Sequence, residues 1–129
     1  MGKTKGKVLV VEDNADEANL IKMILEPEGY EVTLASNGKE GLDKVESDSP
    51  DLIILDVMMP ELDGFATCSK LKSSPEHSGI PVILLTAVAQ RISDTKYPLD
   101  GVLRAEAEEY LEKPVKPEEL LETVAQVLA

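Results

Sequence analysis

The residues of this sequence that could perform chemistry stand at the ends of short apolar runs. Three are carboxylates, Glu12, Asp13 and Asp56, and the other two are Thr86 and Lys113. Three carboxylates brought close together repel one another unless one of them takes a proton or a cation offsets their charge. Because the candidate ligands are oxygen atoms and no His or Cys is nearby, the expected ion is a hard cation such as Mg²⁺.

Phosphoryl transfer is the reaction that these residue types suit. The ammonium of Lys113 would pair with a phosphate as a point charge, and the hydroxyl of Thr86 would donate a hydrogen bond to a second phosphate oxygen. Asp56 is the candidate nucleophile, because an acid directly after the run Leu-Ile-Ile-Leu is hard to explain as a turn cap. A carboxylate nucleophile, a metal ion and two donors form a phosphoryl-transfer site. Each residue alone has a structural explanation, so the prediction depends on their convergence.

The segments that carry these residues have the pattern of strands in a parallel sheet. Residues 8–11, 52–55 and 82–85 are short, apolar runs without polar alternation. This pattern is typical of strands that are buried on both faces. Weaker runs at residues 31–35 and 110–111 predict two further strands.

Helical patterns separate the predicted strands. Asn14 suits an N-cap, and Glu17 suits an acid at the third position of the helix that follows. Pro27 and Gly29 are expected to end this helix. Residues 88–97 are expected to form a long loop. A helix is expected to follow this loop, and Gly101 inside that helix is expected to weaken it. The other predicted helices cover residues 38–47, 65–72, 98–107 and 117–129.

Alternation of strands and helices predicts a doubly wound α/β fold, a five-stranded parallel sheet with helices on both faces. The carboxyl ends of parallel strands share one edge of the sheet, and ligands bind beyond that edge where the strand order reverses. The five candidate residues are therefore expected to converge there by topology alone.

Composition and charge narrow the class of protein. The chain has 129 residues, which suits one domain, and 43% of them are hydrophobic, as in an ordinary globular protein. No apolar run approaches the roughly 18 residues of a membrane span, and the polar start lacks the apolar stretch of a secretory signal. The one cysteine excludes an internal disulfide and fits a reducing cytoplasm. The net charge of −12 argues against direct contact with nucleic acid.

Four stretches of the sequence together resemble the receiver domain of bacterial response regulators, the phosphorylated switches of two-component signalling that include chemotaxis regulators. Each stretch alone is a weak signal, but four in this order are highly specific. The resemblance covers nearly the whole chain. The stretches are residues 8–14 (VLVVEDN), 55–64 (LDVMMPELDG), 81–87 (PVILLTA) and 110–114 (YLEKP).

The resemblance implies a role for each candidate residue. Asp56 would be the phospho-acceptor, and Lys113 would pair with the phosphoryl group. Asp13 and Asp56 would bind Mg²⁺ directly, and the backbone carbonyl of Met58 would be a third protein ligand. Glu12 would act mainly through a water molecule.

The resemblance also implies a flavodoxin-like fold with the strand order 2-1-3-4-5, and a switch. Thr86 would move toward the phosphoryl group, and Tyr110 would change its packing in response. The peptide bond between Lys113 and Pro114 would be cis. The switching surface would include the fourth predicted helix and the fifth strand, and we expect it to be mobile before phosphorylation and ordered after it.

The implied function is a phosphorylation-activated switch in the cytoplasm. A sensor histidine kinase or a phosphotransfer protein would phosphorylate the chain, which would regulate a downstream protein, and the resemblance allows a dimer that forms on phosphorylation. The chain would catalyse its own phosphorylation and dephosphorylation but act primarily as a switch. Residues 1–129 would form a single receiver domain with a disordered tail at residues 1–6, and the last helix would leave no room for an output domain.

Three alternatives stay open at this point. A haloacid-dehalogenase-type phosphatase also uses an Asp after an apolar strand, but such enzymes carry a second Asp two residues later, where this chain has Met58. A flavodoxin-like cofactor binder needs a loop rich in Ser, Thr or Gly after the first strand, where this chain has the acidic residues 12–16. An inactive receiver used only for docking is disfavoured because no site residue is missing.

Overall fold

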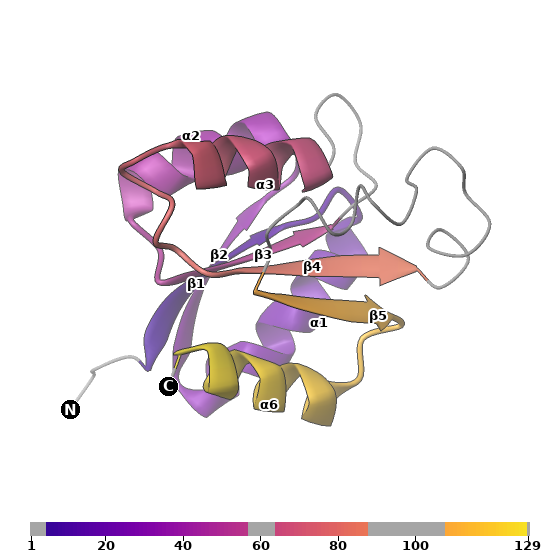
Figure 1. The fold of residues 1–129 in the computed structure, drawn as a ribbon. Coiled ribbons are helices and arrows are strands. Elements are labelled where there is room, and N and C mark those ends of the chain that lie inside the picture. The colour runs from indigo at the N-terminus through magenta and orange to yellow at the C-terminus, as the bar shows by residue number, and fades with distance from the viewer. Residues whose placement is uncertain (1–4, 57–63, 88–107, 129) are drawn as a thin grey trace.

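The computed structural model contains a five-stranded parallel sheet between two layers of helices (Figure 1). The structure describes residues 5–56, 64–87 and 108–128. The strand order is β2-β1-β3-β4-β5, and neighbouring strands pair in parallel throughout. The doubly wound α/β fold and the strand order 2-1-3-4-5 expected from the sequence are therefore confirmed.

Each of the five strands contains one of the runs predicted from the sequence and extends beyond it. Every side chain of the central strand β3 is buried, which explains why its run shows no polar alternation. The first strand, β1, begins at Gly6, inside the stretch 1–6 that was expected to be a tail, because Gly6 pairs with Tyr30. The bounds are β1 Gly6–Val11, β2 Tyr30–Ala35, β3 Leu52–Asp56, β4 Val82–Ala87 and β5 Glu109–Lys113.

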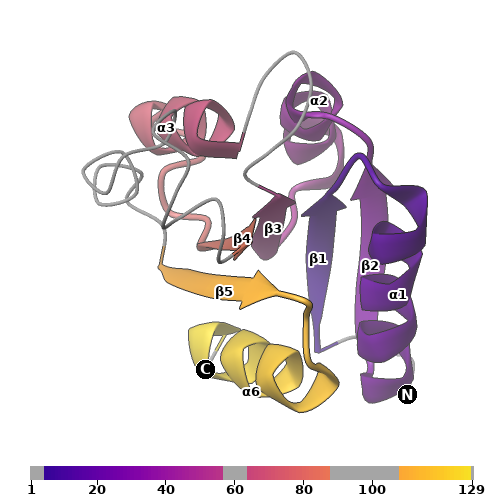
Figure 2. The same cartoon turned by 90° about the vertical axis from the view of Figure 1, so that its right-hand side faces the viewer.

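The helices lie on both faces of the sheet, as Figures 1 and 2 show. On one face are α1 (Ala15–Leu25) and α6 (Pro117–Leu128), and on the other are α2 (Gly38–Asp48) and α3 (Gly64–Ser73). The predicted cap of the first helix is confirmed, because the Asn14 side chain accepts a hydrogen bond from the backbone N–H of Glu17. A short 3-10 turn, η1 (Glu26–Glu28), follows α1.

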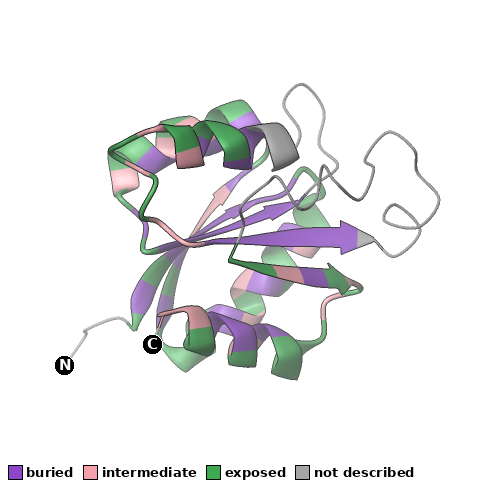
Figure 3. Ribbon diagram, viewed as in Figure 1, coloured by how far each residue is buried: buried purple, intermediate pink, exposed green. Residues whose placement is uncertain are grey.

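The central strands are buried along most of their length (Figure 3). Their alternate residues supply two separate cores, one on each face of the sheet. In β1, Val8 and Val10 face the α1 and α6 side, whereas Leu9 and Val11 face the α2 and α3 side. Helix α2 lies so close to β1 that a Cβ atom at Gly41 would stand 2.8 Å from a methyl carbon of Val11. Glycine at this position therefore lets α2 pack beside the strand that leads into Glu12.

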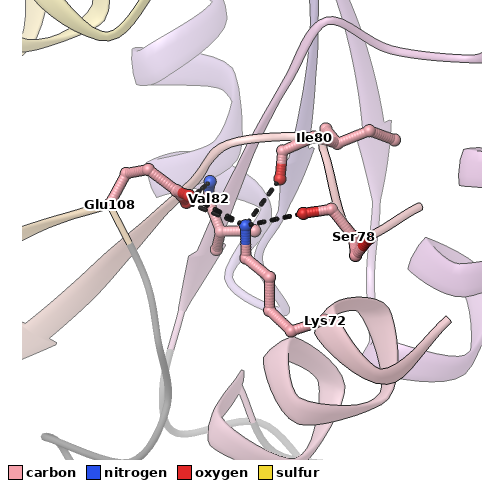
Figure 4. Close-up of polar contacts among 5 residues, drawn as sticks. All are labelled: Lys72, Ser78, Ile80, Val82 and Glu108. Carbon is pink, nitrogen blue, oxygen red and sulfur yellow. Dashed lines mark hydrogen bonds and ion pairs between the residues drawn. The ribbon is translucent and has the colours of Figure 1, made fainter. Parts of the chain in front are cut away.

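Lys72, a half-buried residue, links the end of α3 to the amino-terminal ends of β4 and β5 (Figure 4). The Nζ atom of Lys72 donates to the two carboxylate oxygens of Glu108, at 3.0 and 2.9 Å, and to the backbone carbonyl of Ile80, at 3.0 Å. Glu108 also accepts the backbone N–H of Val82, at 2.7 Å. These contacts hold α3 against the amino-terminal ends of β4 and β5.

Part of what the sequence predicted lies outside the described residues. This applies to the loop at residues 88–97, to the helix at residues 98–107 with Gly101, and to Met58. In the described parts of the chain, no helix is both long enough and apolar enough to cross a membrane.

Candidate functional site

The candidate residues lie at the carboxyl edge of the sheet, opposite the edge where Lys72 lies. Asp56 is the last residue of β3, and Lys113 is the last residue of β5. Glu12 and Asp13 directly follow β1, and Thr86 is the last residue but one of β4. The sheet thus brings residues from four separate strand ends to one edge, as the topology predicted.

The register of the parallel strands aligns the site residues across the sheet. Asp56 of β3 stands opposite Leu85 of β4, the residue before Thr86. Thr86 in turn stands opposite Glu112 of β5, the residue before Lys113. The backbone positions of Asp56, Thr86 and Lys113 therefore follow one another in a diagonal row across three neighbouring strands.

The three carboxylates form a compact cluster. One oxygen from each of Glu12, Asp13 and Asp56 lies within 4.8 Å of the others. Glu12 and Asp56 are 2% and 3% exposed, whereas Asp13 is open to solvent. Oxygen ligands with one side open to water fit a hard divalent cation such as Mg²⁺, which keeps several water ligands. The described residues contain no second cluster of this kind.

Lys113 is the cation that these carboxylates share. Its Nζ atom lies 3.1 Å from Glu12 Oε1, 3.1 Å from Asp56 Oδ2 and 3.4 Å from Glu17 Oε1. The contact with Glu17 was not predicted from the sequence, where the position of Glu17 indicated only a helix-capping acid. One ammonium thus contacts three carboxylates, and the carboxylate of Asp13 lies within the same acidic cluster.

The pKa values of Glu12 and Lys113 are both raised, but for different reasons. Burial first, and then a hydrogen bond with Asp56 and its negative charge, raise the pKa of Glu12 from 4.5 to about 8. Burial alone would lower the pKa of Lys113, but the negative charges of Asp56 and Glu12 outweigh it and raise that pKa above its usual value. Without a bound cation, the direction of the pKa shift favours the protonated form of Glu12 and the charged form of Lys113.

Thr86 has a buried hydroxyl that finds no hydrogen-bond partner in the described part of the chain. A buried polar atom without a partner destabilises a protein by about 1–3 kcal/mol, so such an atom suggests a missing ligand. A phosphoryl oxygen beside Asp56 would supply that partner. The described geometry of Thr86 therefore fits the donor role expected of it.

Two further residues were expected to belong to the site or to its switch. Tyr110, the expected switch residue, is half-buried and packs against the core on the α2 and α3 side. The peptide bond between Lys113 and Pro114 is cis, as expected. Met58, whose backbone carbonyl was expected to bind the metal ion, lies outside the described residues.

Known proteins are similar in sequence to this chain over nearly its whole length. The family model of the response regulator receiver domain matches residues 8–125. An uncharacterised 14.6 kDa protein of Leptolyngbya boryana is 41% identical over 92% of this chain and 87% of its own length. The alkaline phosphatase synthesis transcriptional regulatory protein PhoP of Bacillus subtilis is 40% identical over 95% of this chain and 48% of its own length. This chain thus spans about half the length of the transcriptional regulators that it matches.

A solved receiver domain is similar to this chain in fold as well as in sequence. The signal receiver domain of a signal transduction histidine kinase from Syntrophus aciditrophicus superposes with a TM-score of 0.87 at 40% identity. The match covers 95% of this chain and 89% of that one. These likenesses favour a receiver over a dehalogenase-type phosphatase or a flavodoxin-like cofactor binder. This chain belongs to the response regulator receiver domain family of two-component signalling.

Proposed function

We propose that this chain is a phosphorylation-activated switch and that Asp56 accepts the phosphoryl group. The position of Asp56 carries the proposal: it is buried at the end of β3, within the carboxylate cluster, and its Oδ2 atom lies 3.1 Å from the Nζ atom of Lys113. A buried carboxylate among like charges destabilises a fold, so such clusters favour a functional role over a structural one. Membership of the receiver family supports the same reaction.

The proposed phosphodonor is a phosphohistidine of a sensor histidine kinase or of a phosphotransfer protein. A carboxylate oxygen of Asp56 attacks the phosphorus atom, and the bond from phosphorus to the histidine nitrogen breaks. The electron pair stays on that nitrogen, and the product is an acyl phosphate on Asp56. Attack by water later releases inorganic phosphate and restores the carboxylate, which ends the signal.

Lys113 and Thr86 would stabilise the negative charge of the phosphoryl group during this transfer. The ammonium of Lys113 already stands beside the attacking carboxylate, and the hydroxyl of Thr86 would donate to a second phosphoryl oxygen. Donors that are in place before the reaction stabilise the developing charge without a cost of reorganisation.

The carboxylate cluster would hold the cation that the reaction requires. Asp13 and Asp56 would bind Mg²⁺ directly, together with the backbone carbonyl of Met58, and Glu12 would act mainly through a water molecule. When bound, Mg²⁺ would supply positive charge that offsets the carboxylates and attracts the phosphoryl oxygens. The all-oxygen ligands and the open side at Asp13 support this choice of metal.

The switch would pass from the phosphoryl group to β5 through Thr86 and Tyr110. The register places Tyr110 opposite Leu84, two residues before Thr86. A shift of the Thr86 hydroxyl toward a phosphoryl oxygen would let the half-buried ring of Tyr110 repack, which changes the surface at β5. That surface would then regulate a protein partner or form a dimer.

A protein, and not nucleic acid, is the proposed direct target of these residues. The net charge of −12 opposes binding to phosphates. The relatives named as transcriptional regulators match this chain over about half of their length, so their names do not assign DNA binding to the matched part. Tight binding of this chain to random duplex DNA at physiological salt would overturn the proposal.

Uptake of phosphate from acetyl phosphate tests the reaction. We expect uptake only with Mg²⁺ or a similar cation, and we expect the product to be labile to hydroxylamine, as an acyl phosphate is. Asp56→Asn keeps the shape of the side chain but removes the nucleophile, so this variant should take up no label. Equal labelling of Asp56→Asn and the wild type would contradict the proposal. Absence of labelling from any donor would instead favour an inactive receiver that serves only for docking.

A further inference from the structure

The first two helices of the chain begin with the same capping pattern. Helix α1 follows Asn14 and has Glu17 at its third position, and α2 follows Asn37 and has Glu40 at its third position. In both helices the Asn side chain accepts the backbone N–H of the Glu, at 3.1 and 2.8 Å. The two caps are thus matched in sequence and in their first hydrogen bond.

The carboxylates of the two glutamates differ in what they contact. Glu40 accepts the backbone N–H and the hydroxyl of Ser36, next to the cap, which completes a capping arrangement. At α1, the backbone N–H of Asn14, the cap residue itself, donates to Glu12, at 3.2 Å. The carboxylate of Glu17 instead contacts Lys113, with its Oε1 atom 3.4 Å from the Nζ atom.

The contact between Glu17 and Lys113 is the one that the proposed reaction leaves undisturbed. Asp56 would carry the phosphoryl group, and Glu12 would turn toward the metal ion. Glu17 lies outside the carboxylate cluster, and its side chain is 40% exposed, whereas that of Glu12 is fully buried. Glu17 can therefore keep its contact with Lys113 while a metal ion and a phosphoryl group are bound.

We propose that Glu17 is a positioning residue that holds the ammonium of Lys113 in place for the phosphoryl group. The inference rests on the proposed function of Asp56 and deepens it. Lysine carries its charge on a flexible four-carbon stem, and fixing that stem in advance lowers the entropy lost when the ammonium meets a phosphoryl oxygen. Glu17 acts through Lys113 and touches neither the phosphoryl group nor the metal ion.

The charge of Glu17 also acts through space, with the opposite effect on the reaction. A carboxylate at the rim of the site repels an anionic phosphodonor, so its removal by this effect alone would speed phosphorylation. Positioning of Lys113 predicts instead that removal slows phosphorylation. The sign of the change in rate therefore separates the two roles.

The experiment compares rates of phosphorylation by acetyl phosphate at saturating Mg²⁺. Glu17→Gln keeps the length and shape of the side chain but removes its charge, and it would be made alone and together with Lys113→Met. Glu40→Gln is the matched control, because it removes the same charge from the same helical position, where the structure shows no contact with Lys113. The control thus reports any effect of a weakened helix N-terminus.

We expect Glu17→Gln to slow phosphorylation about threefold, as suits the loss of a partly exposed ion pair, and Glu40→Gln to leave the rate unchanged. In the Lys113→Met background, Glu17→Gln should have no further effect, because the residue that it positions is gone. A rate in Glu17→Gln equal to or above that of the wild type would overturn the inference. A threefold loss that persists without Lys113 would overturn it as well.

A measurement without phosphorylation keeps this inference separate from the proposed function. Exchange of the Lys113 ammonium hydrogens with water, followed by NMR on ¹⁵N-labelled protein, should be about threefold faster in Glu17→Gln than in the wild type or in Glu40→Gln. If the wild type takes up no phosphoryl group, the proposed function fails, and the exchange rates alone decide on Glu17. Equal exchange in all three proteins would overturn the positioning role.

Discussion

Two lysines lie at opposite edges of the sheet and differ in how their charge is balanced. Among the described residues, the carboxylate that Lys72 contacts at the amino-terminal edge is that of Glu108, and the Nζ atom of Lys72 also donates to the backbone carbonyls of Ser78 and Ile80 (Figure 4). At the carboxyl edge, Lys113 contacts three carboxylates. Both lysines are largely buried, with side chains 9% and 19% exposed, so burial alone does not distinguish them.

We interpret the difference as one between a lysine that stabilises the fold and a lysine that is proposed to serve phosphoryl transfer. In the described part of the chain, the carboxylate of Glu108 offsets the ammonium of Lys72 and also accepts the N–H of Val82. Around Lys113 the carboxylates are in excess, and the pKa of Glu12 is raised to about 8 by burial and by Asp56. We infer that the carboxyl edge gives up some stability so that a cation and a phosphoryl group can complete it.

The largest expected effect is the loss of phosphorylation in Lys113→Met. This variant removes the ammonium beside Asp56, and we expect the rate with acetyl phosphate and Mg²⁺ to fall about 100- to 1,000-fold. Lys72→Met makes the same chemical change at the other edge and should stay within about twofold of the wild-type rate. Equal losses in the two variants would break the comparison between the edges.

The raised pKa of Glu12 predicts that the metal-free protein loses stability as the pH rises. The folded protein keeps this proton up to about pH 8, whereas the unfolded chain releases it near the ordinary pKa of 4.5. Between pH 4.5 and about pH 8, the folded state therefore binds more protons than the unfolded state. The contribution of Glu12 to stability is therefore fully present below pH 4.5 and is lost as the pH rises toward about 8. Glu12→Gln has no such proton to lose. Its stability relative to the wild type should rise by about 2–3 kcal/mol between about pH 5 and about pH 7.

Denaturant titrations with a chelator present would measure this pH dependence. Adding Mg²⁺ should remove most of the difference, because the cation takes the place of the proton beside Asp56. If the stability of Glu12→Gln relative to the wild type does not change with pH, then Glu12 is ionised in the metal-free protein and the raised pKa is wrong.

Loss of stability in Lys72→Met is the next effect in size. The variant leaves the carbonyl of Ile80 without its donor and Glu108 without its cation, so we expect it to unfold with a free energy lower by about 2 kcal/mol. Lys70→Met on the exposed side of the same helix is the control and should change stability little. Urea titration measures both, and equal effects would show that the buried contacts of Lys72 contribute nothing particular.

The smallest effect is expected for Asp13→Asn, which acts at the carboxyl edge alone. The variant removes one of the mutually repelling carboxylates, so it should bind Mg²⁺ more weakly. Without metal it should be as stable as the wild type, or more stable by about 1 kcal/mol. Asp43→Asn, on the exposed face of α2, is the control for loss of a negative charge elsewhere. A clear loss of metal-free stability in Asp13→Asn alone would contradict the repulsion within the cluster.

The strands and the residues at their ends could be predicted because both depend on local sequence. An apolar run such as residues 52–55 indicates a buried strand, and parallel topology carries the residue after it, here Asp56, to the shared edge. The cap at Asn14 is equally local. The start of β1 was missed because Gly6 has no strand signal of its own and joins the sheet only through its pairing with β2.

The partners of the two lysines could not be predicted, because each pair is distant in sequence. Glu17 and Lys113 are 96 positions apart, and Lys72 and Glu108 are 36 positions apart. The local pattern at Glu17 indicates a cap, whereas its carboxylate contacts Lys113 at the end of β5. A contact between two elements this far apart in the chain leaves no periodic signal in the sequence.

The central claim is that Asp56 carries the phosphoryl group, and mapping the modified residue tests it most directly. The whole chain would be treated with acetyl phosphate and Mg²⁺, the acyl phosphate would be reduced with borohydride, and the digested peptides would be sequenced by mass spectrometry. We predict reduction at position 56 alone, and none when Mg²⁺ is removed by a chelator. Reduction at Asp13 or at any other residue, or equal reduction at position 56 without the cation, would contradict the account.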